Sequence, residues 1–419
     1  MTPVILAGMK FHKDTGFEKS MKEMCALAEA AGMDVVEILT QGEEAVSPGT
    51  LFGEGKIQEL RQALAFEDAS AVLVNNALSP MQFSNLQHAL DAEVLDRTGL
   101  ILRIFADRAG TREARLQVES ARLSYMLPRL AGLHQELGRQ GGASGALSNK
   151  GAGETKIELD RRHIEHRLTI LRRELDKVTR DRDTQRAKRS SSGLPLVALV
   201  GYTNAGKSTI LNRILESSGS KDEKKVLEEN MLFATLDTSV RKIEPGGGMQ
   251  PFLLSDTVGF ISNLPTALVK AFRSTLEEVC YADLLLIVSD LSDSDCRENL
   301  SVTEDTLQQI GAGKIPRIFV FNKADQTDFL PPAGIPKENR IVISAKRPED
   351  IAALVRFIED KINLTRTECS LLIPYTDGGI LSRLEDSSDV KIIDYTADGT
   401  LLHAFLRPED YRRCQKYLV

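Results

Sequence analysis

Short apolar runs alternate with amphipathic stretches over the first hundred residues. The apolar runs cover residues 3–8, 34–40 and 70–76, and the stretches with helical periodicity cover 17–31, 56–66 and 81–91. Strands separated by helices favour parallel pairing through crossover connections. The pattern therefore predicts a small parallel α/β domain over residues 1–108.

One loop of this domain is rich in glycine. Gly53-Glu54-Gly55-Lys56 opens a predicted helix, where free N–H groups can hold an anion. A turn that needs the φ angles of glycine is the simpler explanation. We favour the turn.

The spacing changes to alternating steps of four and three in two later segments. The apolar series are Leu116, Leu123, Leu127 and Leu130, with Ser120 completing the spacing, and Ile164, Leu168, Leu171, Leu175 and Val178. Such steps mark the a and d positions of a coiled coil. Two of these segments predict an antiparallel coiled helical hairpin over residues 109–192.

A glycine-rich stretch separates the two predicted helices. Residues 138–153 contain six glycines in sixteen positions. With so few side chains, the backbone can approach another surface closely. A projecting hairpin with this tip suits insertion into a narrow crevice, and an inert linker is the alternative.

Serines and a glycine at 190–193 mark the next boundary, because a new apolar run follows them. We expect a second α/β domain over 193–366. Residues 367–419 contain a hairpin that turns at Asp398-Gly399 and a final helix. They predict a small C-terminal α+β domain.

Composition limits the classes of protein that fit. Apolar residues make up 42% and charged residues 27%, and no run approaches the roughly 18 apolar residues of a membrane helix. The N-terminus lacks the pattern of a secretory signal, and the five cysteines are scattered without a CxxC pair. We expect a cytoplasmic, monomeric protein with reduced thiols and no stable membrane anchoring.

Charge is distributed unevenly. The chain carries a net charge of -7, but residues 97–189 contain 21 lysines and arginines against 12 aspartates and glutamates. Such asymmetry is typical of a module that faces a polyanion, and a solvated helical face is the alternative. The predicted RNA-binding residues are Gly141, Gly142, Gly145, Lys150, Arg161, Arg162, Arg172 and Arg173.

A phosphate-binding loop is predicted at GYTNAGKST. The sequence fits GxxxxGK[ST], with an apolar run before it and a helical pattern after it. In this context backbone N–H groups cradle phosphates, the lysine faces the β and γ phosphates, and the serine hydroxyl reaches Mg²⁺. The predicted nucleotide-binding residues here are Gly201, Tyr202, Thr203, Asn204, Ala205, Gly206, Lys207, Ser208 and Thr209.

Two later motifs indicate guanine. Asn322-Lys323-Ala324-Asp325 and Ser344-Ala345-Lys346 each follow an apolar run. At the carboxyl end of a strand, Asp325 would accept two hydrogen bonds from guanine, whereas adenine would leave this carboxylate unpaired. The predicted base site consists of Asn322, Lys323, Asp325, Ser344, Ala345 and Lys346.

A third strand-end motif, Asp256-Thr257-Val258-Gly259, follows the run PFLLS. Asp256 is placed for the magnesium shell and Gly259 for the N–H that senses the γ-phosphate. In FATLD, Thr235 is the expected switch I threonine, with Thr238 as the alternative, and Phe233 is assigned to the nucleotide site. The predicted metal ligands are Ser208, Thr235 and Asp256, and the predicted catalytic residues are Lys207, Thr235 and Gly259.

Phe260 occupies the position after Gly259, where GTPases of the Ras type carry a glutamine that orients the attacking water. Phenylalanine cannot orient water by hydrogen bonding. We therefore expect slow hydrolysis by the protein alone and a need for another group or a partner.

Segments along the whole chain resemble the HflX family of GTPases, relatives of the Obg group. They are LFGEGKIQEL, residues 96–132, GAGETKIELDRR, FATLD with VRKI, and DTVGFISNLP. A hydrophobic residue at the position of Phe260 also fits this group. The resemblance implies a GTPase that binds GTP and GDP with Mg²⁺, binds the large ribosomal subunit and its rRNA, and helps to split stalled or idle ribosomes.

The sequence departs from the family pattern at three places, one of which is a longer segment over residues 216–230. Asp237-Thr238-Ser239 stands where the family has Asp-Pro-Thr, and the tip reads ALSNKGAGETK where relatives are more basic and contain proline. Two other functions stay open. One is an RNA-modifying or RNA-chaperoning GTPase, and the other is a switch-like binding module in which hydrolysis resets a signalling complex.

Overall fold

The computed structural model describes the chain of 419 residues except 13–15, 44–45, 141–149, 192–193, 219–232, 234–238, 246–250, 258, 262–277, 328–333, 365–366, 388 and 407. It divides into two compact units. The first comprises Met1–Val178, Glu229–Asp237 and Ser262–Arg273, and the second comprises Thr179–Glu228, Thr238–Ile261 and Ser274–Val419. The boundaries of the four domains expected from the sequence stay a prediction.

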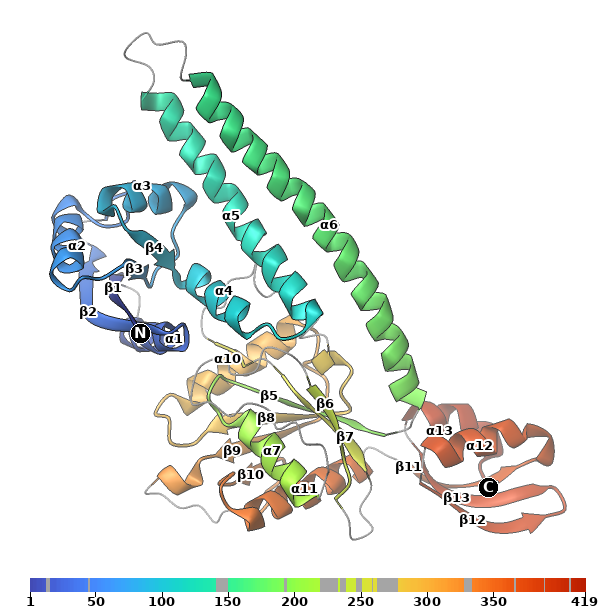
Figure 1. Cartoon of the computed structure of the whole chain (residues 1–419). Helices are drawn as coiled ribbons and strands as arrows, with labels where there is room; N and C mark the ends of the chain where they lie inside the picture. The colour runs from blue at the N-terminus through green and yellow to red at the C-terminus, as the bar shows by residue number, and fades with distance from the viewer. Residues whose placement is uncertain are drawn as a thin grey trace. The chain divides into compact units, whose positions relative to one another are not determined.

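The first unit begins with a parallel four-stranded sheet in the order β2-β1-β3-β4 (Figure 1). Its strands are β1 (Thr2–Lys10), β2 (Met33–Gly42), β3 (Ala71–Val74) and β4 (Glu93–Asp96), and the helices are α1 (Phe17–Ala30), α2 (Glu54–Phe66), α3 (Pro80–Leu90) and α4 (Arg97–Arg108). The predicted parallel α/β domain is confirmed. The strand β4 was not predicted, because acidic residues occupy both of its ends, whereas β3, of the same length, is wholly apolar.

Helix ends in this domain follow local chemistry. Ser79 and Gln82 form a reciprocal capping box at the start of α3. Gly53 caps α2 with a φ of -71°, and Gly55 also lacks a positive φ. The predicted turn that requires glycine φ angles is therefore wrong, because α2 begins directly at Glu54.

Asp96 joins the sheet to the helix that follows α4. Its Oδ1 accepts hydrogen bonds from the Gly99 N–H at 2.8 Å and the Tyr125 hydroxyl at 2.6 Å. Its Oδ2 accepts from Arg129 Nη2 at 2.9 Å. Burial, and then the charge of Asp96, raise the pKa of Tyr125. Because Asp96 is only 1% exposed, this carboxylate fixes α4 and the next helix together.

The helices α5 (Arg112–Gln140) and α6 (Lys150–Ser191) run side by side (Figure 1). Glu119 accepts two hydrogen bonds from Arg167, at 2.7 and 2.8 Å, and Arg112 pairs with Glu174 at 3.1 Å. A residue seven positions earlier on α5 thus has its partner seven positions later on α6. This is the register of antiparallel helices. The predicted hairpin is confirmed.

The glycine-rich segment between these helices is shorter than expected from the sequence. α5 continues through Gly138, and α6 already includes Gly151 and Gly153. Residues on either side of these glycines continue the helical hydrogen bonds. The stabilisation from these bonds outweighs the roughly 1 kcal/mol by which each glycine destabilises a helix.

A six-stranded sheet in the order β10-β9-β8-β5-β7-β6 forms the centre of the second unit. The strands are β5 (Leu196–Gly201), β6 (Ser239–Ile243), β7 (Phe252–Asp256), β8 (Leu284–Asp290), β9 (Arg317–Asn322) and β10 (Arg340–Val342). Only β6 pairs in an antiparallel manner among these strands. The parallel strands bring the carboxyl ends of β5, β7, β8 and β9 to one edge, where residues of the predicted nucleotide site lie.

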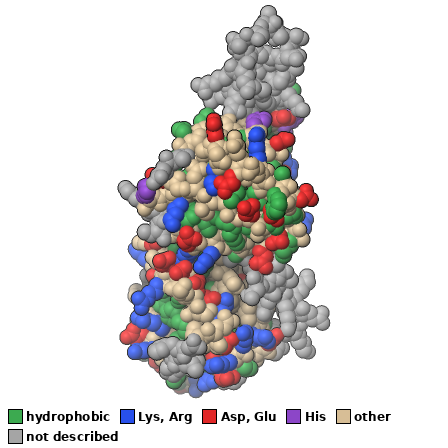
Figure 2. All heavy atoms as spheres, turned by 90° about the vertical axis from the view of Figure 1, so that its left-hand side faces the viewer, with side chains coloured by type: hydrophobic (Ala, Val, Ile, Leu, Met, Phe, Trp, Pro, Cys, Tyr) green, Lys and Arg blue, Asp and Glu red, His purple; other side chains and the backbone are tan. Residues whose placement is uncertain are grey.

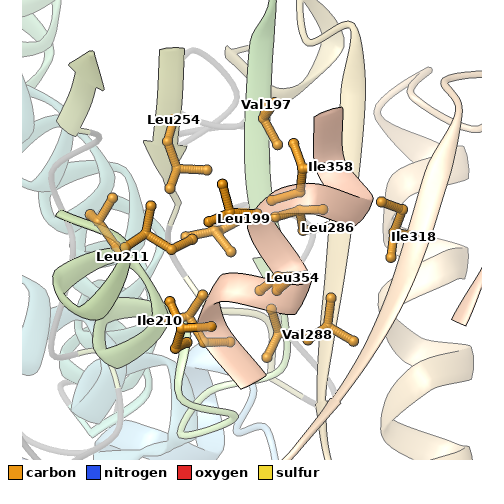
Figure 3. Close-up of a cluster of buried hydrophobic side chains, with 14 of the residues drawn as sticks. Val197, Leu199, Ile210, Leu211, Leu254, Leu286, Val288, Ile318, Leu354 and Ile358 are labelled. Atoms are coloured by element: carbon orange, nitrogen blue, oxygen red, sulfur yellow. The ribbon is translucent and has the colours of Figure 1, made fainter. Parts of the chain in front are cut away.

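Apolar side chains of α7 (Lys207–Ser217) and α11 (Pro348–Leu364) cover this sheet. Figure 3 shows Ile210 and Leu211 of α7 and Leu354 of α11 pointing toward strand residues. These three residues are fully buried. Each such side chain contributes about 1.5–3 kcal/mol to folding, so the core holds the phosphate loop between β5 and α7 in place. The helix α10 (Cys296–Gln309) connects β8 with β9.

The C-terminal residues form an antiparallel sheet in the order β11-β13-β12. Its elements are β11 (Thr367–Ile373), α12 (Gly378–Ser387), β12 (Asp389–Thr396), β13 (Gly399–Leu406) and α13 (Pro408–Cys414). Gly399 has a φ of +156°, and a Cβ there would collide with the Ile373 backbone. The predicted α+β fold is confirmed. The turn lies one residue earlier than predicted, at Ala397-Asp398, because Gly399 pairs with Thr396 and begins β13.

Two features of the described surface bear on function. No described helix is long and apolar enough to cross a membrane. Figure 2 shows acidic and basic side chains interspersed on the face that it presents. The chain has a net charge of -7, but its acidic side chains do not form one continuous patch on that face.

Candidate guanine-nucleotide site

The phosphate loop connects β5 to α7 and depends on two glycines. Gly201 has a φ of +147°, and a Cβ there would collide with the Val288 carbonyl. Gly206 has a φ of +92°, and a Cβ there would collide with the side-chain amide of Asn322. Both glycines are therefore required by left-handed φ angles and close approach. Asn204 also has a positive φ, of 61°.

Lys207 lies at the start of α7 with its side chain folded onto this loop. Nζ donates to the carbonyls of Gly201 at 3.1 Å and Tyr202 at 2.8 Å. Burial lowers the pKa of Lys207 to about 8, although the nearby Asp256 carboxylate favours the charged form. A bound phosphate would favour that charged form further, as expected for a lysine that faces the β and γ phosphates.

Two predicted metal ligands lie together beside the loop. Ser208 Oγ donates to Asp256 Oδ2 at 2.8 Å, and Thr257 N–H donates to Asp256 Oδ1 at 3.0 Å. Asp256 is fully buried at the end of β7. A hydroxyl and a carboxylate oxygen in contact suit a hard cation that takes its remaining ligands from water and phosphate. No described cluster of three His, Cys, Asp or Glu side chains offers another metal site.

The segment after β7 lies directly on the phosphate loop. Phe260 N–H donates to the Gly201 carbonyl at 3.0 Å, and Thr203 N–H donates to the Phe260 carbonyl at 2.8 Å. A Cβ on Gly259 would lie 2.8 Å from Thr203 Cγ2 and 3.0 Å from Lys207 Nζ. Gly259 is therefore close to the lysine that would face the γ-phosphate. The Phe260 side chain is 2% exposed.

Asn322 connects three of the predicted motifs. Its Nδ2 donates to the Ala205 carbonyl at 3.0 Å, and its Oδ1 accepts from the Ala345 N–H at 3.0 Å. One amide thus joins the phosphate loop, the strand end of β9 and the loop that begins at Ser344. Because Asn322 is 2% exposed, these bonds are shielded from water.

Asp325 is held in an acceptor state. Its Oδ1 accepts from Ser344 Oγ at 2.7 Å, and its Oδ2 accepts from Lys346 Nζ at 2.7 Å. The hydrogen bond from Lys346 is the main cause that lowers the pKa of Asp325. The carboxylate is therefore ionised at neutral pH, as the recognition of two guanine donors requires.

Two further residues shape this base site and were not predicted from the sequence. Asp290, at the end of β8, pairs with Lys323 Nζ at 2.7 Å. Asp350 accepts the Ser344 N–H at 2.8 Å and is 4% exposed. The position of Asp290 after an apolar run was a signal of the kind that identified Asp256 and Asp325. Asp350 lies in a helix and gave no such signal.

Phe233 was predicted to bind the nucleotide, and Thr235 was predicted to bind the nucleotide and Mg²⁺ and to act in catalysis. Phe233, with a φ of +57°, packs edge to face on Phe105 of α4 within the first unit, with ring centroids 4.7 Å apart. Its ring is 2% exposed. Thr235, Asp237 and Thr238 lie outside the described residues.

The predicted RNA-binding residues fall into two groups. Arg161 donates to Glu165 at 3.0 Å and Arg162 to Glu158 at 3.2 Å along α6. Arg172 and Arg173 are exposed, and no pairing with a described residue is found for either. Lys150 begins α6, whereas Gly141, Gly142 and Gly145 lie outside the described residues.

Comparison with known proteins decides the family. Models described as GTP-binding GTPase N-terminal, GTP-binding GTPase Middle Region and 50S ribosome-binding GTPase match residues 18–106, 108–189 and 196–323. GTPase HflX of Caldanaerobacter subterraneus subsp. tengcongensis is 40% identical over 96% of this chain and 91% of its own length. GTPase HflX of Escherichia coli is 36% identical over 98% and 95%. The chain belongs to the HflX family of GTPases.

The fold of this HflX-family chain is shared with solved GTP-binding proteins. The crystal structure of the SsGBP–GDP complex aligns with 86% of this chain and with 99% of the SsGBP chain. The sequence identity is 24% and the TM-score is 0.50. At this identity the likeness concerns the fold. The family shows that the protein binds GTP and hydrolyses it, which confirms the activity expected from the motifs.

Proposed function

We propose that the protein binds the large ribosomal subunit through the hairpin α5–α6 and, in its GTP form, splits stalled or idle ribosomes. The observation that carries the proposal is this long antiparallel hairpin, which lies within a stretch of 21 basic and 12 acidic residues. Exposed arginines on α6 suit RNA phosphates. The match of residues 196–323 to a model described as 50S ribosome-binding GTPase supports the same partner.

Within the GTPase reaction we assign four roles to residues in and beside the phosphate loop. Lys207 neutralises charge on the β and γ phosphates, and the Gly259 N–H senses the γ-phosphate. Thr235 closes on this site in the GTP form. Ser208 and Asp256, joined at 2.8 Å, would hold Mg²⁺ together with Thr235. The ion would supply positive charge to the phosphate oxygens.

Two measurements test the proposal. We expect the protein to sediment with large ribosomal subunits when a non-hydrolysable GTP analogue is present, and to lower the light scattering of intact ribosomes when GTP is present. Sedimentation without a change in scattering would favour an RNA-modifying or RNA-chaperoning GTPase. Absence of both would favour a switch-like binding module.

Replacing Arg172 and Arg173 by alanine should weaken binding to the large subunit. Removing one arginine that binds a phosphate should flatten the slope of log affinity against log salt by about one unit. A salt titration of subunit binding measures this slope. Arg161→Ala and Arg162→Ala should have smaller effects, because both arginines donate to glutamates on the same helix.

Arg297→Ala is the matched control for these variants, since Arg297 is exposed on α10, away from the hairpin sequence. It should leave the salt slope unchanged. If all five variants bind with the slope of the unaltered protein, the basic helices are a solvated face.

Shortening residues 141–153 to a tight turn should separate binding from splitting. The arginines of α6 remain, so the variant should still bind ribosomes and hydrolyse GTP at its basal rate. It should split ribosomes slowly, and ribosomes should stimulate its GTP hydrolysis only weakly, because the tip acts by fitting a narrow crevice. Splitting at the normal rate in the light-scattering assay would show that the segment is only a linker.

A further inference from the structure

A buried carboxylate lies behind the predicted base site. Asp350 is the third residue of α11 and is only 4% exposed. A charge at this depth is costly unless hydrogen bonds compensate for the water that it has lost. Asp350 lies outside the sequence motifs of the nucleotide site, so its contacts must explain why it is buried.

The apolar core fixes the position of Asp350. Ile351, Leu354 and Ile358 of the same helix are at most 1% exposed, and Figure 3 shows Leu354 and Ile358 among the strand residues of this core. A Cβ on Gly334 would lie 3.2 Å from Asp350 Oδ1, so the backbone at Gly334 lies close to this oxygen. The carboxylate is therefore carried by a rigid element.

Asp350 makes its hydrogen bond to the backbone of the base site. Its Oδ2 accepts from the Ser344 N–H at 2.8 Å, and this bond is buried. Among the described residues, no lysine or arginine forms an ion pair with Asp350, and this N–H is the hydrogen-bond partner of its side chain. Hydrogen bonds to an ionised acceptor are stronger than neutral ones. The bond therefore fixes the backbone two residues after β10, which ends at Val342.

Ser344 connects this bond to Asp325. Its hydroxyl donates to Asp325 Oδ1 at 2.7 Å and accepts from the Lys346 N–H at 3.3 Å. Its carbonyl accepts from the Arg347 N–H at 2.9 Å. Ser344 is fully buried, and its single hydroxyl proton is used on Asp325. The orientation of the Asp325 carboxylate thus depends on the position of the Ser344 backbone.

We propose that Asp350 is a positioning residue for guanine. Through Ser344 it holds the Asp325 carboxylate in the orientation that accepts from N1–H and the exocyclic amine of the base, for which each oxygen keeps a second lone pair. Paired hydrogen bonds between two planar groups depend on their relative orientation. A carboxylate that is already oriented does not have to be ordered when the nucleotide binds, which raises affinity. The inference rests on the proposed guanine contact of Asp325.

The alternative is that Asp350 only stabilises the start of α11. An acidic residue in the first turn of a helix interacts favourably with the helix dipole. Glu349 occupies the same turn and is exposed, so it supplies this interaction without the cost of burial. A role in stability alone would not change the choice of base by the folded protein.

The decisive quantity is the preference of the full-length, nucleotide-free protein for GDP over inosine diphosphate, which lacks the exocyclic amine. Calorimetric titration with Mg²⁺ gives both affinities per folded molecule. Asp350→Ala leaves the Ser344 N–H without its acceptor, so GDP affinity should fall by about tenfold or more and the preference by about fivefold or more. Asp350→Val fills the space without an acceptor and should have the same effect, which provides a second measurement if the alanine variant is unstable.

Two further variants separate the hydrogen bond from helix stability. The amide oxygen of Asp350→Asn can still accept from the Ser344 N–H, so this variant should keep the preference within about twofold of the unaltered protein. Glu349→Ala removes an exposed acid from the same helix turn and should leave both affinities unchanged. Thermal unfolding of the nucleotide-free proteins measures any loss of stability separately.

Asp325→Ala in the same titration distinguishes failure of this inference from failure of the guanine contact. If Asp325→Ala abolishes the preference for GDP while Asp350→Ala and Asp350→Val keep it, Asp350 has only a structural role and the inference is wrong. If Asp325→Ala also keeps the preference, the proposed contact of Asp325 is wrong, and the inference fails with it. An Asp350→Asn protein that loses as much preference as Asp350→Ala would overturn the inference too, because the bond to Ser344 would not be the cause.

Discussion

Replacing Asp325 by asparagine is expected to exchange guanine specificity for xanthine specificity. Asp325 accepts hydrogen bonds at both carboxylate oxygens in the free protein, from Ser344 and Lys346. With guanine bound, the carboxylate would accept from N1–H and the exocyclic amine. An asparagine amide instead presents a donor, which pairs with the additional carbonyl of xanthine.

The expected size of this effect follows from the loss of two hydrogen bonds to a charged group. At about 1.5–3 kcal/mol each, GTP affinity should fall by about 10² to 10⁴-fold. Calorimetric titration of Asp325→Asn with GTP, xanthosine triphosphate and ATP measures the exchange. Asp305→Asn, an exposed change on α10, is the control and should keep the preference for GTP. Equal binding of ATP and GTP by the unaltered protein would contradict the assignment.

Hydrolysis by the free protein is expected to be slow and to rise strongly with large ribosomal subunits. Even with a water-orienting glutamine, GTPases of the Ras type turn over at only about 10⁻⁴ s⁻¹ alone. Here the corresponding residue is Phe260, and its side chain is buried. Phosphate release measured with and without subunits gives both rates.

Variants at two positions separate water positioning from phosphate binding. Lys207→Ala should abolish detectable hydrolysis, because it removes the charge that we propose faces the phosphates. Phe260→Ala should retain hydrolysis within about tenfold per folded molecule, since its hydrogen bonds with Gly201 and Thr203 are made by the backbone. The poorer packing should lower stability by about 3–5 kcal/mol, so folded protein must be measured in parallel. A folded Phe260→Ala protein that binds GTP but does not hydrolyse it would show that the side chain acts in the chemistry.

That many residues of the candidate nucleotide site lie together could be predicted, because they occupy equivalent places in a repeated pattern. Gly201, Asp256 and Asn322 each end an apolar strand of a parallel sheet. Parallel pairing brings such ends to one edge of the sheet, irrespective of the length and conformation of the loops. The residue types then indicate phosphate, metal and base from their chemistry. Asp290 belongs to the same edge and could have been found in the same way.

The remaining features depend on faces that meet only in three dimensions. The contact of Asp96 with Tyr125 and Arg129 joins residues about thirty positions apart. The packing of Phe233 on Phe105 likewise joins distant segments that share no periodicity.

By itself, the sequence determined the order of the elements, the parallel pairing, the antiparallel hairpin and the residues suited to guanine nucleotide. These follow from local hydrophobic periods and from the chemistry of side chains at strand ends. The tertiary structure alone decided which arginines pair between helices, as Arg167 does with Glu119, how far the helices extend past Gly138 and which polar atoms are buried without a partner. Such properties depend on the distance between side chains from separate elements or on hydrogen bonds along a whole helix, and no short window of sequence contains that information.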